Sequence, residues 1–514
     1  MRHFDFADHH RGQQVTRRRS DDSDDIDDSD DIAPRMDIET MTFHPEPGGQ
    51  AHATAEDSLD GLPLPQRYWA MLTIAVAVSM TVLDAVVANV ALPTIARDVG
   101  ASPAASIWVV NAYQLALVIS LLPLSSLGDI FGYRKIYQAG FAVFTIASLC
   151  CALSHSLISL GIARFIQGLG AAGIVSVNTA LIRTIFPSKI LGRGLGINAM
   201  VVAVSAAIGP TFAAGILSLA SWPWLFAVNV PVGILGLGIS LRTLPRSGGS
   251  GHRFDLKSAL LSGLTFGLLI SGVDGFGHGQ AAWAAAAEIT AAILIGIWFV
   301  RRQLSQPAPL FAVDLLRRPS FALSVATSVC SFAAQMLAYV SLPFYLQNVL
   351  GRSPVECGLL ISPWPLAILL AAPIAGHLAD RYSAGILGGA GLATMTLGLI
   401  SLALLPAHPD STSIIWRMAL CGLGFGFFQA PNNREMLASA PKQRSGAASG
   451  MLGTARVTGQ TLGAALVALI FTMFSNSGNT VALVVGAGFA AGAAIVSCMR
   501  IGRPPAGYAS HATQ

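Results

Sequence analysis

An acidic residue inside a long apolar stretch is the first feature of this sequence that could do chemistry. The stretch runs from Trp69 to Pro93 and carries Asp84 about two-thirds of the way along. About 20 apolar residues are enough to cross a bilayer as a helix. A charge at that depth costs on the order of 3 kcal/mol, so such residues usually face the bundle interior and serve an ion or substrate route. The alternative is a protonated Asp84 that makes a structural hydrogen bond to a neighbouring helix.

A basic residue in another apolar stretch is the natural partner for Asp84. Arg164 lies in the segment Ala163-Arg164-Phe-Ile-Gln167, followed by closely spaced glycines. Arginine keeps its charge, so inside a membrane it needs an anion or must extend to the boundary. We hypothesise that Arg164 meets Asp84. A guanidinium favours the ionised carboxyl and burial favours the protonated one, so the balance could let Asp84 bind and release a proton.

Further polar and aromatic side chains within apolar stretches indicate a cavity that holds a substrate. They are Asn89, Trp108, Asn111, Tyr113, Gln114, Gln167, Gln335, Tyr339 and Gln429. Aromatic faces would suit a planar or quaternary cation. Hydrogen bonding between helices is the alternative for each polar member. We expect protonated Asp84 and the substrate to compete for, or alternate in, one cavity.

The composition indicates which kind of structure holds these residues in place. Of 514 residues, 53% are hydrophobic and 11% are charged, whereas soluble domains average about 25% charged. The chain is therefore expected to be an all-α membrane protein that crosses the bilayer repeatedly, and fourteen apolar spans can be counted from Trp69 onward. The six cysteines form no CxxC or Cys/His cluster, which indicates neither a metal site nor a disulfide framework.

The placement of basic residues predicts the orientation. Loops that follow the even-numbered spans are rich in Lys and Arg, whereas the opposite side holds only Arg97 and Arg352. Because positive loops stay inside, both termini are expected in the cytoplasm.

Short motifs recur about 250 residues apart, such as Leu92-Pro93 and Leu342-Pro343. This offset predicts two parallel six-helix halves, with two further spans between them as an inserted hairpin. The acidic, polar leader has few apolar residues to bury, so disorder is expected there. The predicted division is 1–66 cytoplasmic tail, 67–245 first half, 246–318 inserted hairpin with linkers, 319–503 second half and 504–514 cytoplasmic tail.

Several of these segments resemble the major facilitator superfamily, and in particular its fourteen-spanner drug:proton antiporters. The resemblance rests on Gly128-Asp129-Ile-Phe-Gly132-Tyr-Arg134-Lys135 after span two, on Leu83-Asp84 with Asn89-Val-Ala-Leu-Pro93, and on Trp222-Pro-Trp224-Leu-Phe-Ala-Val-Asn229-Val-Pro231-Val-Gly233. It implies the major facilitator fold with 14 transmembrane helices, and it implies that the Arg164 motif takes part in proton coupling.

The resemblance also implies which residues open and close the transporter. These gating residues are Asp129, Gly132, Arg134 and Lys135 after span two, Gly209 and Pro210 in span five, and Asp380 and Arg381 in the second-half loop. Ile130 and Tyr133 stand where the family has basic residues, which changes the pairing open to Asp129. The charges of these loops could alternatively serve orientation alone, and the Gly209-Pro210 kink could serve packing alone.

We therefore expect a proton-coupled antiporter that exports small hydrophobic or cationic compounds across the inner (plasma) membrane by alternating access. One alternative is a transporter of one specific metabolite, and another is a membrane sensor or scaffold that does not transport. No enzymatic role is expected, and no phosphate-binding GxxxxGK[ST] loop is present, which disfavours ATP as the energy source. Neither a cofactor other than the coupling proton nor a nucleic-acid partner is expected. The chain is expected to act as a monomer in the lipid bilayer, with a small molecule as its substrate.

Overall fold

The computed structural model describes residues 61–187, 190–245, 254–277, 280–305, 313–379, 381–440, 445–474 and 477–501. The predicted tails 1–66 and 504–514 lie almost entirely outside them, as does Asp380.

The described residues form helices, and fourteen of the resulting segments are long and apolar enough to cross a membrane. The expectation of an all-α membrane protein with fourteen spans is thus confirmed. The first six spans are built from α1 (Leu64–Asp98), α2 (Pro103–Ser106), α3 (Trp108–Phe131), α4 (Tyr133–Ala152), α5 (Leu157–Ile185), α6 (Leu191–Leu219), α7 (Trp224–Ala227) and α8 (Asn229–Thr243). The next two spans are α9 (Leu256–Gly277) and α10 (Ala282–Leu304).

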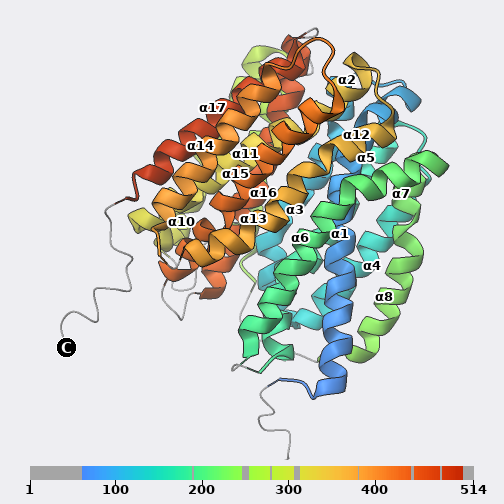
Figure 1. Ribbon diagram of the computed structural model, residues 1–514. Helices are drawn as coiled ribbons and strands as arrows, with labels where there is room; N and C mark the ends of the chain where they lie inside the picture. The colour runs from blue at the N-terminus through green and yellow to red at the C-terminus, as the bar shows by residue number, and fades with distance from the viewer. Residues whose placement is uncertain are drawn as a thin grey trace, which may run out of the picture. The chain divides into compact units, whose positions relative to one another are not determined.

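The remaining spans follow a 3-10 turn, η2 (Val313–Arg317). They comprise α11 (Pro319–Phe344) with the π-helical turn η3 (Tyr345–Val349), α12 (Pro354–Ile361), α13 (Pro363–Leu378), α14 (Ala384–Ala403), α15 (Ser411–Ala438), α16 (Ser445–Met473) and α17 (Gly478–Cys498). In Figure 1 the helices coloured blue to green lie together, as do those coloured orange to red.

Glycines let neighbouring helices approach closely, and they do so in the same way in both halves. A Cβ added at Gly173 of α5 would lie 2.8 Å from the Gly140 Cα of α4. In the second half, a Cβ at Gly391 of α14 would lie 2.6 Å from the Gly424 carbonyl oxygen of α15. The spacing of about 250 residues seen in the sequence therefore recurs as a repeated helix crossing, which small residues make possible.

The two halves meet along a seam formed by α1, α3 and α6 on one side and α11, α12 and α16 on the other. At the Asp98 end of α1, the apolar side chains Val90, Leu92 and Ile95 belong to one core with Leu346 and Leu360. The hairpin helix α9 lies beside this seam, because it packs on α10, on α3 of the first half and on α16 of the second.

Candidate functional site

A buried cluster around Asp84 of α1 involves three further helices of the first half, α4, α5 and α8. The Asp84 carboxylate forms an ion pair with Arg164 of α5. It also accepts hydrogen bonds from Gln167 Nε2 at 2.8 Å and from Asn229 Nδ2 of α8 at 3.0 Å. The structure thus brings Asp84 and Arg164 together as the sequence hypothesis requires. It shows Arg164 bound to an anion inside the bundle, with 1% of its side chain exposed, and not extended to a boundary.

Arg164 has partners besides the carboxylate. Its Nε donates to the Val109 carbonyl at 3.0 Å, and its Nη1 donates to Gln167 Oε1 at 2.7 Å. Its guanidinium carbon lies 4.3 Å from the centre of the Tyr113 ring and 5.5 Å from that of Phe226. These contacts can hold the guanidinium in place while the carboxyl changes its protonation state, because hydrogen-bond acceptors and aromatic faces both stabilise a cation.

The Asp84 carboxyl is enclosed by protein. None of its side chain is exposed, and Gln167 is also fully buried, with its amide held additionally by Ser148 Oγ at 2.9 Å. In this conformation, donors from α5 and α8 occupy both oxygens of the Asp84 carboxyl. That protonated Asp84 and the substrate compete for, or alternate in, one cavity stays a prediction.

Other residues expected to line a cavity in the first half lie on α1 and α3. Asn89, Asn111, Tyr113 and Gln114 are buried, whereas Trp108 is half-buried. The Tyr113 hydroxyl lies 3.5 Å from the Thr81 carbonyl. Buried Asn89 Oδ1 has no hydrogen-bond partner among the described residues, which leaves an amide that a bound molecule or water could satisfy.

In the second half, the expected cavity residues lie on α11 and α15. Gln335 is buried, and Tyr339 and Gln429 are half-buried. The Tyr339 ring lies 5.0 Å from the Trp364 ring in an edge-to-face arrangement. Gln335 and Tyr339 are one helical turn apart and therefore share a face of α11.

In the predicted gating loop, the acid and the arginine each have a hydrogen-bond partner. Asp129 is exposed and accepts a hydrogen bond from the Tyr133 hydroxyl at 2.6 Å. Arg134 donates to the Leu241 carbonyl at the end of α8. Lys135 is exposed, and Gly132 has φ 95°, a conformation that favours glycine between α3 and α4. Tyr133 thus donates a hydrogen bond to Asp129 from a position where the family has a basic residue.

The other predicted gating residues lie at the seam or on the surface. A Cβ at Gly209 would lie 2.7 Å from Val86 Cγ1 of α1. The Pro210 carbonyl lies 2.4 Å from where a Cβ would stand at Gly358 of α12, so α6 touches the second half closely at this point. Arg381 is exposed, and Asp380 is outside the described residues.

Three contributors to these sites were not predicted as site residues from the sequence, although Asn229 belongs to a motif that carries the family resemblance. Asn229 and Ser148 belong to the Asp84 cluster, and Gln347 of η3 crosses the seam. Gln347 Nε2 donates to the Val90 carbonyl at 3.1 Å, and its Oε1 accepts from Thr94 at 3.2 Å and from Arg97 at 3.5 Å. A polar residue within or next to an apolar span was the available signal for all three.

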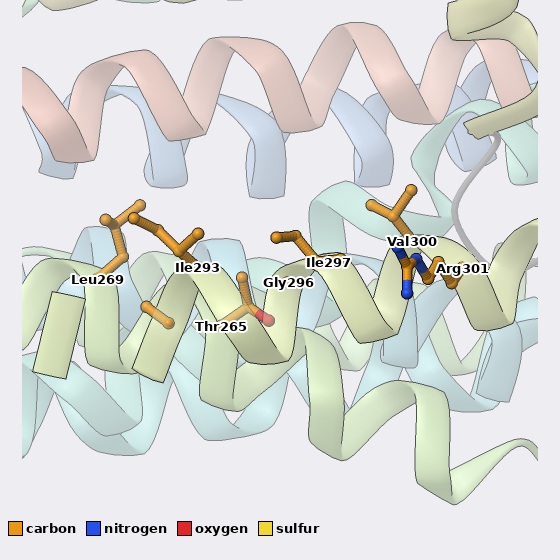
Figure 2. Close-up of a pocket in the computed structure, with 8 residues that line it drawn as sticks. Thr265, Leu269, Ile293, Gly296, Ile297, Val300 and Arg301 are labelled. Carbon is orange, nitrogen blue, oxygen red and sulfur yellow. The ribbon is translucent and has the colours of Figure 1, made fainter. Parts of the chain in front are cut away.

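A groove between α9 and α10 lies apart from these sites. Thr265 and Leu269 line it from α9, and Ile293, Gly296, Ile297, Val300 and Arg301 line it from α10 (Figure 2). None of the residues predicted from the sequence contributes to it.

Fourteen spanning helices, a repeated pattern of helix crossings and a buried acid–arginine pair define a multi-pass membrane protein of the transporter type. The chain belongs to the Major Facilitator Superfamily, whose model matches residues 74–464. It is 60% identical over 447 residues to the uncharacterized transporter YebQ of Escherichia coli (strain K12), covering 87% of this chain and 98% of that protein.

More distant relatives carry more specific names. The riboflavin transporter RibZ of Clostridioides difficile (strain 630) is 30% identical over 79% of this chain and 88% of that protein. The multidrug efflux pump LfrA of Mycolicibacterium smegmatis is 30% identical over 80% of this chain and 82% of that protein. Among solved structures, a POT family transporter matches with a TM-score of 0.64 at 15% identity, over 85% of this chain and 96% of that one, which shows the shared fold.

Proposed function

We propose that this transporter exports small, largely apolar compounds from the cell in exchange for protons, with Asp84 as the proton-binding residue. The observation that carries the proposal is the buried Asp84 carboxylate, whose one cationic partner among the described residues is Arg164. A proton and Arg164 are alternative ways to neutralise this carboxylate. The proton therefore releases Arg164 and loosens α5 from α1, while the Val109 carbonyl and Tyr113 ring keep the guanidinium satisfied.

In this scheme the proton acts through helix positions and does not compete directly with the substrate. The Arg164 guanidinium contacts Tyr113 of α3, and α3 packs against α16 across the seam. A change at Asp84 can thus reach the seam through one packed helix. In the proposed scheme, the seam end where Gln347 bonds to α1 faces the exterior, as the positive-inside expectation predicts. Inward flow of protons releases about 2.3 kcal/mol per 100 mV of membrane potential.

The test is Asp84→Asn, assayed with Asp84→Glu as the matched control. A panel of dyes, quaternary ammonium compounds and antibiotics in an efflux-deficient host, with and without an uncoupler, first selects a transported compound. In everted vesicles, Asp84→Asn should abolish proton-driven flux of that compound, and Asp84→Glu should retain it. Full proton-driven flux through folded Asp84→Asn would show that the acid is purely structural.

Transport of a single metabolite is a second candidate, which the similarity to the riboflavin transporter RibZ favours. It predicts saturable flux of one compound that the rest of the panel does not inhibit. Broad mutual inhibition across the panel would instead support multidrug export.

A further inference from the structure

Arg456 of α16 is a second arginine within the membrane-spanning bundle, and its charge is not neutralised. Its guanidinium lies 5.7 Å from the centre of the Phe332 ring. Among the described residues, no carboxylate and no hydrogen-bond acceptor contacts it. Arg164, in contrast, has both an anion and two acceptors. An arginine cannot discharge itself by losing its proton, so Arg456 leaves a net positive charge in the bundle.

The depth of Arg456 shows that its head group is not at the membrane boundary. Gly453, one turn earlier, faces Leu121 at the middle of α3, with 3.6 Å between Leu121 Cδ2 and the place of a Gly453 Cβ. Phe332, beneath the guanidinium, is at the middle of α11. Extension of the side chain toward water at the membrane boundary does not explain this placement of Arg456.

The contacts of α16 show which way Arg456 points. Gly459 and Gly463 pack on α11, at the Val329 and Ala333 carbonyls, whereas Gly453 and Val457 pack on the first half. At 3.6 residues per turn, Arg456 falls between these two faces of the helix. It therefore points into the seam between the halves, where it is half-buried and within electrostatic range of the Tyr113 hydroxyl.

Groups suited to the rest of a ligand lie beside it. Phe332, Gln335 and Tyr339 follow one another at helical spacing on α11. The ring of Phe332 already contacts Arg456, and no hydrogen bond from the Gln335 amide to another described residue is formed. An aromatic surface, a free amide and an uncompensated cation together fit an aromatic molecule with an acidic group.

We propose that Arg456 binds the anionic group of the substrate, so that the transported compounds are aromatic carboxylates or similarly acidic molecules. This inference rests on the proposed function, because it concerns the small, largely apolar compounds that the protein is proposed to export, and it adds that they bind at the seam. It narrows these compounds to those with an acidic group and disfavours cationic compounds, since a cation at this place meets the positive charge of Arg456. A charge-assisted hydrogen bond within the bundle supplies the selectivity.

The experiment measures equilibrium binding to the purified full chain in nanodiscs. The probes are benzoate, naphthoate and anthracene carboxylate, each beside its neutral amide and its methylammonium counterpart. Wild type should bind at least one carboxylate tenfold or more tightly than the matching amide. Arg456→Gln should lose about tenfold to a hundredfold in carboxylate affinity and leave amide binding unchanged, and Arg456→Lys should retain part of the preference.

Arg417→Gln is the matched control, because Arg417 is an arginine of α15 whose contacts, Ser413 and the Trp416 ring, lie on its own helix. Thermal unfolding verifies that each variant is folded. Absence of carboxylate binding in wild type, equal binding of acid and amide, or equal losses in Arg456→Gln and Arg417→Gln would overturn the proposal. Binding needs neither a proton gradient nor transport, so the outcome is independent of the Asp84 flux experiment.

Discussion

At the scale of single residues, removing one partner of the Asp84–Arg164 pair strongly lowers the stability of the folded protein. Both side chains are buried, and removing one partner of a buried ion pair leaves an uncompensated charge that destabilises by about 3–5 kcal/mol. Replacing both partners by neutral groups avoids that penalty. The pair's contribution to stability can therefore be separated from its role in coupling.

We predict that Asp84→Asn lowers the thermal stability of the detergent-solubilised protein and that Asp84→Asn/Arg164→Gln recovers much of it. The physical reason is that the double variant has no unpaired charge at the cluster. The unfolding temperatures of wild type, Asp84→Asn, Arg164→Gln and the double variant form a double-mutant cycle. Simple addition of the two single losses would count against an energetic coupling between the residues. The double variant should still lack proton-driven flux.

At the scale of the elements, close helix crossings fix where the polar residues lie. Gly173 allows α5 to approach α4 near Gly140, and α5 carries Arg164 and Gln167 toward Asp84. A wider crossing would move both donors away from the carboxylate.

We predict that Gly173→Ala is destabilising by about 1–3 kcal/mol, because its Cβ would press on the Gly140 backbone at 2.8 Å. Gly161→Ala in the same helix is the control, since its Cβ would meet nothing within 4 Å. That substitution should be neutral or stabilising by up to about 1 kcal/mol, through helix propensity. Thermal unfolding of the two variants gives the comparison, and similar values for both would contradict the crossing geometry.

At the scale of the whole molecule, Gln347 and the apolar core around Leu346 and Leu360 hold the halves together at one end. The hydrogen bonds between the Gln347 side chain and three residues of α1 contribute more to this closed arrangement than to either half alone, because they cross the seam.

We predict that Gln347→Leu shifts the protein toward a state that is open at this end. Spin labels at Asp98 and Val349, both exposed, should report longer distances in a cysteine-free background. Arg417→Gln serves as the control, because its bonds lie within α15. An unchanged distance distribution would mean that apolar contacts alone keep this end closed.

The sequence carried much of this architecture, for reasons that are local. A chain that crosses a membrane has few alternatives to a helix, so the fourteen spans could be predicted from the lengths of the apolar segments. The contact between Asp84 and Arg164 could be predicted because two opposite charges inside a membrane stabilise each other. The enclosure of Asp84 by Asn229 could not, because it depends on how far α8 lies from α1. The same holds for Tyr133, whose hydroxyl reaches Asp129 only in the turn that Gly132 creates.

The position of α9 has a consequence for motion. This helix packs against both α3 and α16. When one half rotates against the other, α9 must therefore either move with one half or slide along the other. Gly263 and Gly267 present a face of α9 on which an added methyl group would touch nothing. Bulky side chains introduced along this helix on the side toward α3 and α16 should then slow turnover without altering which compounds are carried.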